Sequence, residues 1–258
     1  MKKNRVYQCD VIDFLKALDD ESIDLAIIDP PYNMGKGDWD KFSDEDYFKF
    51  TDEWLTAVVP KLKPTASLYV FNTAYNSAII LQKLISLGMQ FRNWITWYKK
   101  DGFSATKKKY VNTQETILFL SKSDEYTFNF DDIRQPYDSV DRMKHAAQKG
   151  ILKNGKRWFP NEKGKLCNDV WEITSQRHKV KVNGKVQALQ HPTIKPYEMI
   201  ERMIKASSNP DDTVLDLFSG SGMTSIVAQA LGRNYIGCEN NSEYIELIEK
   251  EGIEIGRL

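Results

Sequence analysis

The 258-residue chain is poor in cysteine and contains no long apolar run. Its three cysteines, Cys9, Cys167 and Cys238, are scattered, so they form neither a disulfide framework nor the spacing of a metal site. Apolar runs such as Ala78–Leu81 fall far short of the ~18–20 residues that cross a membrane. No apolar segment of the secretory type follows the basic N-terminal residues. We therefore expect a soluble, cytoplasmic protein without a structural metal.

The chain also has no net charge, with 36 basic and 36 acidic residues, but these charges are segregated along it. Residues 10–53 contain 14 acidic and 4 basic side chains, whereas residues 142–188 contain 12 basic and 3 acidic ones. A second basic cluster around residues 107–109 follows Trp94 and Trp97. Basic patches interleaved with aromatic residues suit a phosphate backbone and unstacked bases. Nucleic acid is therefore a candidate partner, and a solvated surface is the alternative.

Short β-rich runs alternate with helix-like stretches over most of the chain. This alternation implies parallel pairing and an α/β doubly wound sheet. Periodicity fails between residues 134 and 190, a stretch too long for an ordinary loop, so we interpret it as an inserted recognition segment. The expected strands are 6–9, 23–28, 67–71, 91–98, 115–120, 213–217 and 234–238, and the expected helices are 11–18, 44–59, 78–87, 197–207, 224–231 and 242–250.

Two consecutive strand ends near the C-terminus predict a nucleoside site. The strand at 213–217 runs into a glycine-rich turn containing Gly220 and Gly222, where backbone N–H groups and a helix N-terminus can approach a ligand. Glu239 ends the next strand, 19 residues after Gly220, where an acid accepts hydrogen bonds from ribose hydroxyls. A dinucleotide is disfavoured, because Ser225 stands where a third glycine would be. The alternative is a tight turn followed by a surface acid.

A third strand end, Asp29-Pro30-Pro31-Tyr32, combines a carboxylate, a carbonyl that the prolines hold rigidly, and an aromatic ring. Neither proline can continue a central strand, since neither donates a hydrogen bond. A strand terminator with a packing tyrosine is the simpler interpretation. However, two acceptors beside an aromatic face also suit a planar ring that carries an amino group. If the strands are neighbours, Asp10, Asp29, Gly220 and Glu239 meet in one cleft at the carboxyl edge of the sheet.

Taken together, these motifs resemble those of the S-adenosylmethionine-dependent amino methyltransferases that act on DNA. Asp29-Pro30-Pro31-Tyr32 resembles their catalytic motif, Asp216–Gly222 their cofactor motif, and His191–Pro196 a further motif of the cofactor wall. The motif order is similar to that of the beta class. The resemblance implies a class I methyltransferase, Rossmann-like fold with a mixed, mostly parallel sheet. It also implies a catalytic half at 1–133, a target-recognition insert at 134–190 and a cofactor-binding half at 191–258.

The resemblance assigns roles to individual positions of this chain. It implies that the target base is held by four catalytic-loop residues, Asp29, Pro30, Pro31 and Tyr32. Met223 stands where the family commonly has threonine, which puts a hydroxyl contact there in doubt. The implied cofactor-binding residues are Asp10, Asp29, His191, Thr193, Lys195, Asp216, Phe218, Gly220, Ser221, Gly222 and Glu239. The candidate DNA-binding residues are Lys107, Lys108, Lys109, Lys144, Arg157, Arg177 and Lys179.

The reaction that the resemblance implies is direct methyl transfer from S-adenosyl-L-methionine to adenine N6 of a flipped-out base in double-stranded DNA. It would serve as the modification half of a restriction-modification system, without a metal or a covalent enzyme intermediate. In this family Asp at position 29 favours adenine N6, whereas Ser would favour cytosine N4. Cytosine N4 transfer, an RNA or protein amide substrate, and an inactive DNA-binding protein of the same fold stay open. The resemblance makes a homodimer plausible and leaves the recognised sequence undetermined.

Overall fold

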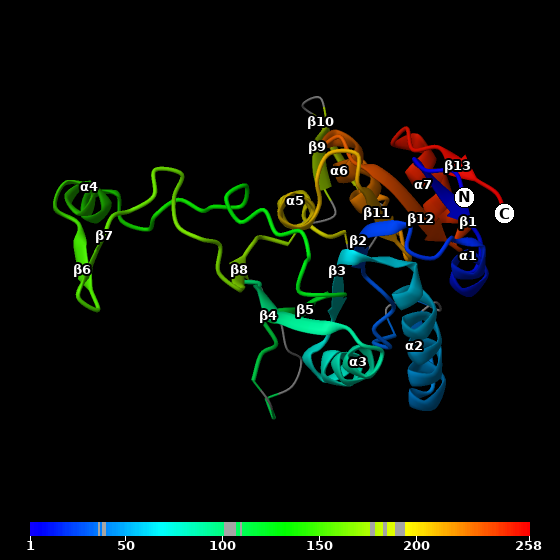
Figure 1. Cartoon of the computed structure of the whole chain (residues 1–258). Helices are drawn as coiled ribbons and strands as arrows, with labels where there is room; N and C mark the ends of the chain where they lie inside the picture. Colours follow the sequence, from blue (N-terminus) through cyan, green and yellow to red (C-terminus); the bar gives the residue numbers. More distant parts are fainter. Residues whose placement is uncertain are drawn as a thin grey trace.

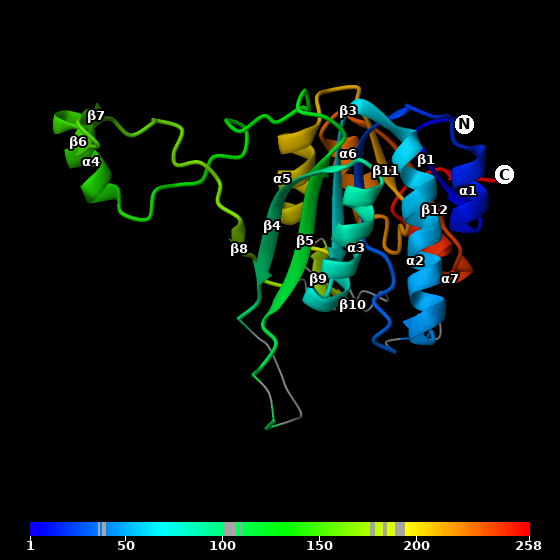
Figure 2. The ribbon, with the colours of Figure 1, turned by 60° about the horizontal axis from the view of Figure 1, so that its bottom comes forward.

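A computed structural model describes residues 1–35, 37, 40–100, 107–108, 110–175, 179–182, 185–188 and 194–258. Within them, nine strands form one sheet in the order β13-β1-β12-β11-β2-β3-β5-β4-β8, with helices packed against both faces (Figures 1 and 2). These strands are β1 (Arg5–Gln8), β2 (Ile23–Ile28), β3 (Leu62–Asn72), β4 (Gln90–Tyr98), β5 (Gln114–Ser121), β8 (Val170–Glu172), β11 (Thr213–Asp216), β12 (Asn234–Glu239) and β13 (Ile255–Gly256).

This nine-stranded sheet is mixed and mostly parallel, because among its described strand pairs only β3–β5 and β4–β5 are antiparallel. The described helices are α1 (Val11–Ala17), α2 (Asp44–Val58), the short 3-10 helix η2 (Val59–Lys61), α3 (Ala74–Ser86), α4 (Val140–Lys149), α5 (Tyr197–Ser207), α6 (Met223–Ala230) and α7 (Ser242–Lys250). The predicted α/β fold, a doubly wound and mostly parallel sheet, is confirmed.

Side chains on the two faces of the central strands form two separate cores. In β2, Ala26 and Ile28 pack with the helices α1, α2 and α3, whereas Leu25 and Ile27 pack with α5, α6 and α7. This division follows from the strand pleat, since successive side chains point to opposite faces. Both faces of β2 are therefore covered, which is why its residues 25–28 form a continuous apolar run.

Two elements begin several residues earlier than their sequence patterns predict. Helix α3 starts at Ala74 rather than at residue 78, because the Thr73 side chain caps it by accepting a hydrogen bond from the Asn76 backbone N–H. Strand β3 starts at Leu62 and includes Pro64, which a regular strand would exclude. The β2–β3 register shifts over this stretch, so Pro64 lies in an irregular part of the ladder.

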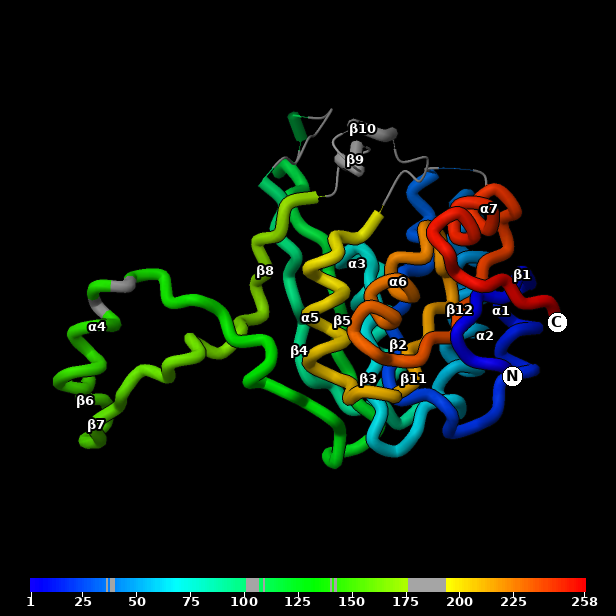
Figure 3. Tube along the Cα trace, turned by 90° about the horizontal axis from the view of Figure 1, so that it is seen from above, coloured from blue at the N-terminus to red at the C-terminus, as the bar shows by residue number. Residues whose placement is uncertain are grey.

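The segment predicted as a non-periodic insert contains several elements. Within residues 134–190, β8 joins the main sheet beside β4, and β9 (Lys179–Val182) pairs with β10 (Lys185–Ala188). Helix α4 and the hairpin of β6 (Ile151–Lys153) and β7 (Lys156–Trp158) stand away from the sheet in every view (Figure 3). We call residues 136–164 the arm. Its base is closed by paired backbone hydrogen bonds between Gln135 and Lys165.

None of the described helices is both long enough and apolar enough to cross a membrane.

Candidate active site

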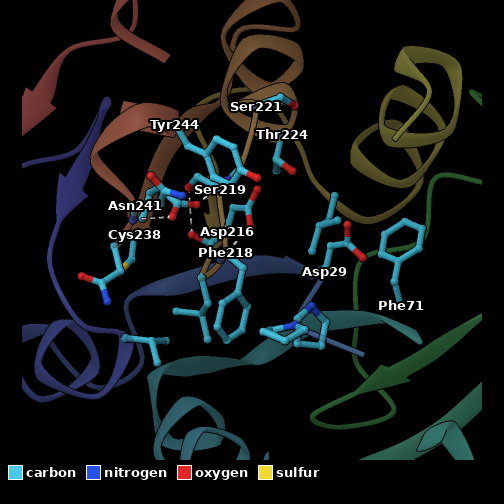
Figure 4. Close-up of a pocket in the computed structure, with 18 of the residues that line it drawn as sticks. Asp29, Phe71, Asp216, Phe218, Ser219, Ser221, Thr224, Cys238, Asn241 and Tyr244 are labelled. Atoms are coloured by element: carbon cyan, nitrogen blue, oxygen red, sulfur yellow. Dashed lines mark hydrogen bonds between the residues drawn. The ribbon is translucent and has the colours of Figure 1, made fainter. Parts of the chain in front are cut away.

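The carboxyl ends of β2, β11 and β12 lie side by side in the sheet and open onto one cavity of about 430 Å³ (Figure 4). In this view Asp29 lies on one side of the cavity, with Asn241 and Tyr244 on the other. The sequence-derived candidates that line it are Asp10, Asp29, Pro30, Pro31, Tyr32, Lys195, Asp216, Phe218, Gly220, Ser221 and Glu239. Residues more than 200 positions apart in the sequence thus share one pocket, because the sheet order places their strands together.

Three of the candidates for cofactor binding are not placed in this cavity. Gly222 is not among its lining residues. It forms the N-cap of α6 with a left-handed φ of 74°, and a side chain at this position would press against Ile248. Its evident role is to shape the turn. His191 and Thr193 lie outside the described residues.

The glycine-rich turn and Glu239 are locked together by backbone donors. The Gly220 N–H donates to Glu239 Oε2 over 2.8 Å, and the Asn241 N–H donates to Oε1 over 2.8 Å. Burial raises the pKa of Glu239, and these two hydrogen bonds partly oppose that shift. The carboxylate is therefore held at the cavity edge, and its oxygens retain further lone pairs for hydroxyl donors.

Asp216 ends β11 behind this turn and is almost fully buried. Its Oδ1 accepts a hydrogen bond from the Phe218 N–H over 3.2 Å. Burial raises the pKa of Asp216 to about 7, and the nearby charges of Asp29 and Glu239 act in the same direction. A carboxyl group that titrates near neutral pH therefore lies under the glycine-rich turn.

This raised pKa makes the stability of the ligand-free protein depend on pH. Between pH ~4 and ~7 the folded protein holds a proton on Asp216 that the unfolded chain releases, so folding becomes less favourable as pH rises. We expect Asp216→Asn to remove this loss of stability at rising pH. In thermal unfolding scans, the melting temperature of Asp216→Asn minus that of wild type should increase from pH 5 to pH 8. The control Asp132→Asn, at an exposed position, should follow wild type, and equal pH profiles for Asp216→Asn and wild type would contradict the assignment.

Both carboxylate oxygens of Asp29 are engaged. Oδ2 accepts a hydrogen bond from Lys195 Nζ over 2.6 Å, and Oδ1 accepts one from the Tyr32 hydroxyl over 2.8 Å. Lys195 is 8% exposed, and its ammonium group also lies 5.1 Å from the centre of the Phe71 ring. The predicted catalytic carboxylate and the predicted cofactor-wall lysine therefore form an ion pair.

A second carboxylate, Glu115 of β5, belongs to the same cluster. Its Oε2 lies 3.8 Å from Lys195 Nζ and accepts a hydrogen bond from the Tyr32 hydroxyl over 3.4 Å. Its Oε1 pairs with Lys99 of β4. Glu115 also lines the cavity, yet the sequence analysis did not single it out. The one available signal in the sequence was its position at the end of an apolar strand. An acidic side chain at the end of a buried strand needs a partner for its charge.

The loop after Tyr32 is held by Asp40, another residue that the sequence analysis missed. Asp40 accepts hydrogen bonds from the backbone N–H groups of Tyr32, Asn33 and Met34, at 2.7, 2.7 and 3.0 Å. Asn76 of α3 donates to the Tyr32 carbonyl over 3.0 Å. These contacts fix the backbone of the Asp-Pro-Pro-Tyr loop on both sides of the Tyr32 ring, as preorganised sites require.

Aromatic rings form the wall under the glycine-rich turn. Phe218 makes edge contacts with Phe50 and Trp54 of α2, with ring centres 6.1 and 5.9 Å apart. Phe50 and Tyr244 were not predicted to contribute to the site, but both line the cavity. The amphipathic pattern of α2 predicts only that Phe50 and Trp54 are core-facing. It does not indicate that the helix packs beside a turn 170 residues later.

The candidate DNA-binding residues Lys107, Lys108, Lys144 and Arg157 lie outside the cavity. All four are exposed, and Arg157 also donates a hydrogen bond to the Lys149 carbonyl inside the arm. Lys179 is described only as backbone of β9, while Lys109 and Arg177 lie outside the described residues. No group of His, Cys, Asp or Glu in the described part of the chain is arranged to hold a metal ion.

Comparison with known proteins gives consistent results over nearly the whole chain. A family model described as DNA methylase, of the N6 and N4 type, matches residues 23–250. The Type II methyltransferase M1.MboII of Moraxella bovis is 56% identical over 243 residues, which cover 94% of each chain. The DNA adenine methyltransferase YhdJ of Escherichia coli (strain K12) is 36% identical over 92% of this chain and 79% of its own.

Solved structures support the fold. The crystal structure of M1.HpyAVI in complex with SAM superimposes with a TM-score of 0.64 at 23% sequence identity, and the match covers 96% of this chain and 98% of the other. At this identity the likeness concerns the fold.

Proposed function

Because the chain belongs to the DNA methylase family, we propose that it methylates adenine N6 in double-stranded DNA as the modification enzyme of a restriction-modification system. Its predicted identity as a beta-class amino DNA methyltransferase resembling the MboII enzyme agrees with the 56% identity to M1.MboII. The observation that carries the proposal is the position of Asp29 in the cavity that Gly220 and Glu239 also line. A restriction-modification role implies that the protein acts in the cytoplasm, where its host's DNA lies.

The cofactor is S-adenosyl-L-methionine, which supplies an activated methyl group when bound. The cavity residues fit it in three respects. The Glu239 carboxylate, oriented by two backbone N–H groups, suits the ribose hydroxyls. The turn at Gly220 leaves room for the backbone to approach the methionine part, and Phe218 offers an apolar wall. We assign Asp10, Lys195, Asp216 and Ser221 to the same pocket.

Replacing Glu239 tests this assignment. We expect Glu239→Ala to weaken S-adenosylmethionine binding roughly tenfold to a hundredfold, since hydrogen bonds to a charged group contribute about 1.5–3 kcal/mol. Titration calorimetry on the purified protein would measure the change. Glu246→Gln, an exposed change on α7, serves as the control. Equal cofactor affinity for Glu239→Ala and wild type would place the pocket elsewhere.

At the catalytic loop, Asp29 and the Pro30 carbonyl serve as acceptors for the two hydrogens of the target amino group. That nitrogen is a poor nucleophile because its lone pair delocalises into the ring. Two acceptors in fixed positions favour a localised lone pair directed at the methyl group, so the rate enhancement comes from positioning and preorganised electrostatics. Pro31 and the Asp40 contacts keep these acceptors rigid, and the Tyr32 ring stacks on the base.

The amino group is paired inside duplex DNA, so the adenine must leave the base stack, which costs a few kcal/mol. We propose that the insert at 134–190 supplies the compensating contacts, with residues 1–133 and 191–258 as the catalytic and cofactor-binding halves. The exposed arm carries Lys144 and Arg157, and its β7 ends at the half-exposed Trp158. We also propose a homodimer, which light scattering of the purified protein would test.

The direct test is transfer of a labelled methyl group to unmethylated duplex DNA. The DNA is digested to nucleosides and analysed by mass spectrometry. We expect labelled N6-methyladenine, because Asp rather than Ser precedes the two prolines. N4-methylcytosine is the second candidate, favoured by the family model's inclusion of both types. If the digested DNA yields no labelled nucleoside although the protein binds the cofactor, that result would support an inactive DNA-binding protein instead.

A further inference from the structure

The present contacts of Asp29 compete with the role proposed for it. Its two oxygens already accept hydrogen bonds from Lys195 and Tyr32, at 2.6 and 2.8 Å. A target amino group needs one of these oxygens in the geometry of a strong hydrogen bond, and the Tyr32 ring must be free to stack. Each oxygen could accept a second hydrogen bond, but the hydroxyl bond holds the Tyr32 ring beside Asp29 and Lys195 competes with the amino group for Oδ2, so we expect at least one of the two partners to move away as the base enters.

Releasing Lys195 without a new partner would be costly. The side chain is 9% exposed, and its ammonium group lies against the rings of Phe71 and Tyr32. A buried charge that loses its counter-ion is strongly destabilised. The same reasoning applies in weaker form to the buried Tyr32 hydroxyl, which needs an acceptor in any position it takes.

Glu115 is placed to receive both groups. Its Oε2 lies 3.8 Å from Lys195 Nζ and 3.4 Å from the Tyr32 hydroxyl, so a displacement of about 1 Å would bring either to normal hydrogen-bond length. The strand that carries it, β5, lies between β3 and β4 and is paired along its length, so the backbone provides a fixed support. Lys99 pairs with the other oxygen of Glu115, so the cluster contains two lysines and two carboxylates and its charges balance.

We propose that Glu115 is a positioning residue that takes over Lys195 and the Tyr32 hydroxyl when Asp29 turns to the target amino group. This inference rests on the proposed function and deepens it. Without the Glu115 charge, Lys195 stays on Asp29 and competes with the incoming base. The alternative is a static ion-pair cluster that only stabilises the fold.

The test compares Glu115→Gln with wild type. We expect single-turnover methyl transfer to unmethylated plasmid DNA to slow about tenfold to a hundredfold, as misplacement of a reacting group by 1 Å can cost on that order. Cofactor affinity should stay close to wild type, and the melting temperature should fall by no more than the loss of the Lys99–Glu115 ion pair accounts for. Glu172→Gln removes a carboxylate from β8, which pairs with β4, where it forms an exposed ion pair with Lys100, and serves as the matched control. It should transfer methyl groups at the wild-type rate.

The pH profile separates positioning from simple structural support. Burial alone would lower the pKa of Lys195, but the charges of Asp29 and Glu115 outweigh it and hold that pKa above its usual value, with Asp216 acting in the same direction. Burial and these same two carboxylates also raise the pKa of Tyr32. Removing the Glu115 charge lowers both pKa values. In the pH profile of the transfer rate, the decline at high pH (the alkaline limb) should therefore move to lower pH in Glu115→Gln.

Two results would overturn the inference. One is a wild-type transfer rate in Glu115→Gln. The other is a slower transfer rate whose fall at high pH is not shifted from that of wild type, together with comparable losses of cofactor affinity and melting temperature. In both cases, methyl transfer by the wild-type protein would still support the proposed function. An inactive wild-type protein on all DNA tested would instead contradict the proposed function itself.

Discussion

Asp29→Ala is expected to abolish methyl transfer while cofactor affinity stays within a fewfold of wild type. Loss of one preorganised hydrogen-bond partner typically costs 10²–10³ in rate, and we propose that Asp29 is the carboxylate that the Asp-Pro-Pro-Tyr loop presents to the amino group. Glu239 and the glycine-rich turn are untouched, so the cofactor pocket should persist. Single-turnover transfer with labelled S-adenosylmethionine and calorimetry with unlabelled cofactor would measure the two quantities separately.

The alanine variant also leaves Lys195 without its closest carboxylate, and breaking a buried pair can cost about 3–5 kcal/mol of stability. Asp29→Asn is therefore the necessary companion, because it keeps the shape and one acceptor. We expect it to fold and to bind the cofactor but to transfer methyl groups at a rate far below wild type. A folded Asp29→Asn protein with near wild-type turnover would show that the carboxylate is not needed.

Removing the arm is expected to eliminate site-specific methylation. Gln135 and Lys165 are hydrogen-bonded across its base, so residues 137–163 can be replaced by a short Gly-Ser linker without stretching the chain. Among those of the excised residues 137–163 whose exposure is described, only Ala146 is buried, so the sheet core should lose little. Since each base contact is worth about 1–3 kcal/mol, losing several should lower the rate at the recognised site by more than about 10².

Melting temperature and cofactor affinity of the excised protein should match wild type, which separates loss of recognition from unfolding. A milder variant supports the same conclusion. Charge reversal at Lys144, Lys149 and Lys153 should weaken DNA binding and flatten its salt dependence, by about 0.9 in the log–log slope for each lysine that contacts a phosphate. An excised protein that methylates the same sequence at the wild-type rate would place recognition elsewhere in the chain.

The sequence predicts best those parts of the site that depend on local pattern. The strand, turn and acid at 213–239 form a contiguous unit, so their order alone indicates that Gly220 and Glu239 lie together, and the structure brings them within 2.8 Å. Helix α5 has the predicted bounds because its apolar residues recur at helical spacing and Pro196 precedes it.

What the sequence does not predict depends on pairing between distant segments. Glu115 reaches the cavity only because β5 runs antiparallel beside β3, and alternating strands and helices predict parallel pairing. Asp40 acts by accepting hydrogen bonds from backbone N–H groups. Every residue except proline has such a group, so the sequence does not indicate this contact. Strand β8 was not predicted at all, since three residues are too few to show a period.

One measurement tests the central claim most directly. A host strain lacking its own adenine methylation would express wild-type protein or Asp29→Ala, and its genome would be sequenced with detection of modified bases. We predict N6-methyladenine at one defined sequence context in the wild-type strain and unmodified adenines at the same sites with Asp29→Ala. Genomes without N6-methyladenine despite folded, cofactor-binding wild-type protein, or equal methylation in both strains, would contradict adenine transfer by the Asp29 loop.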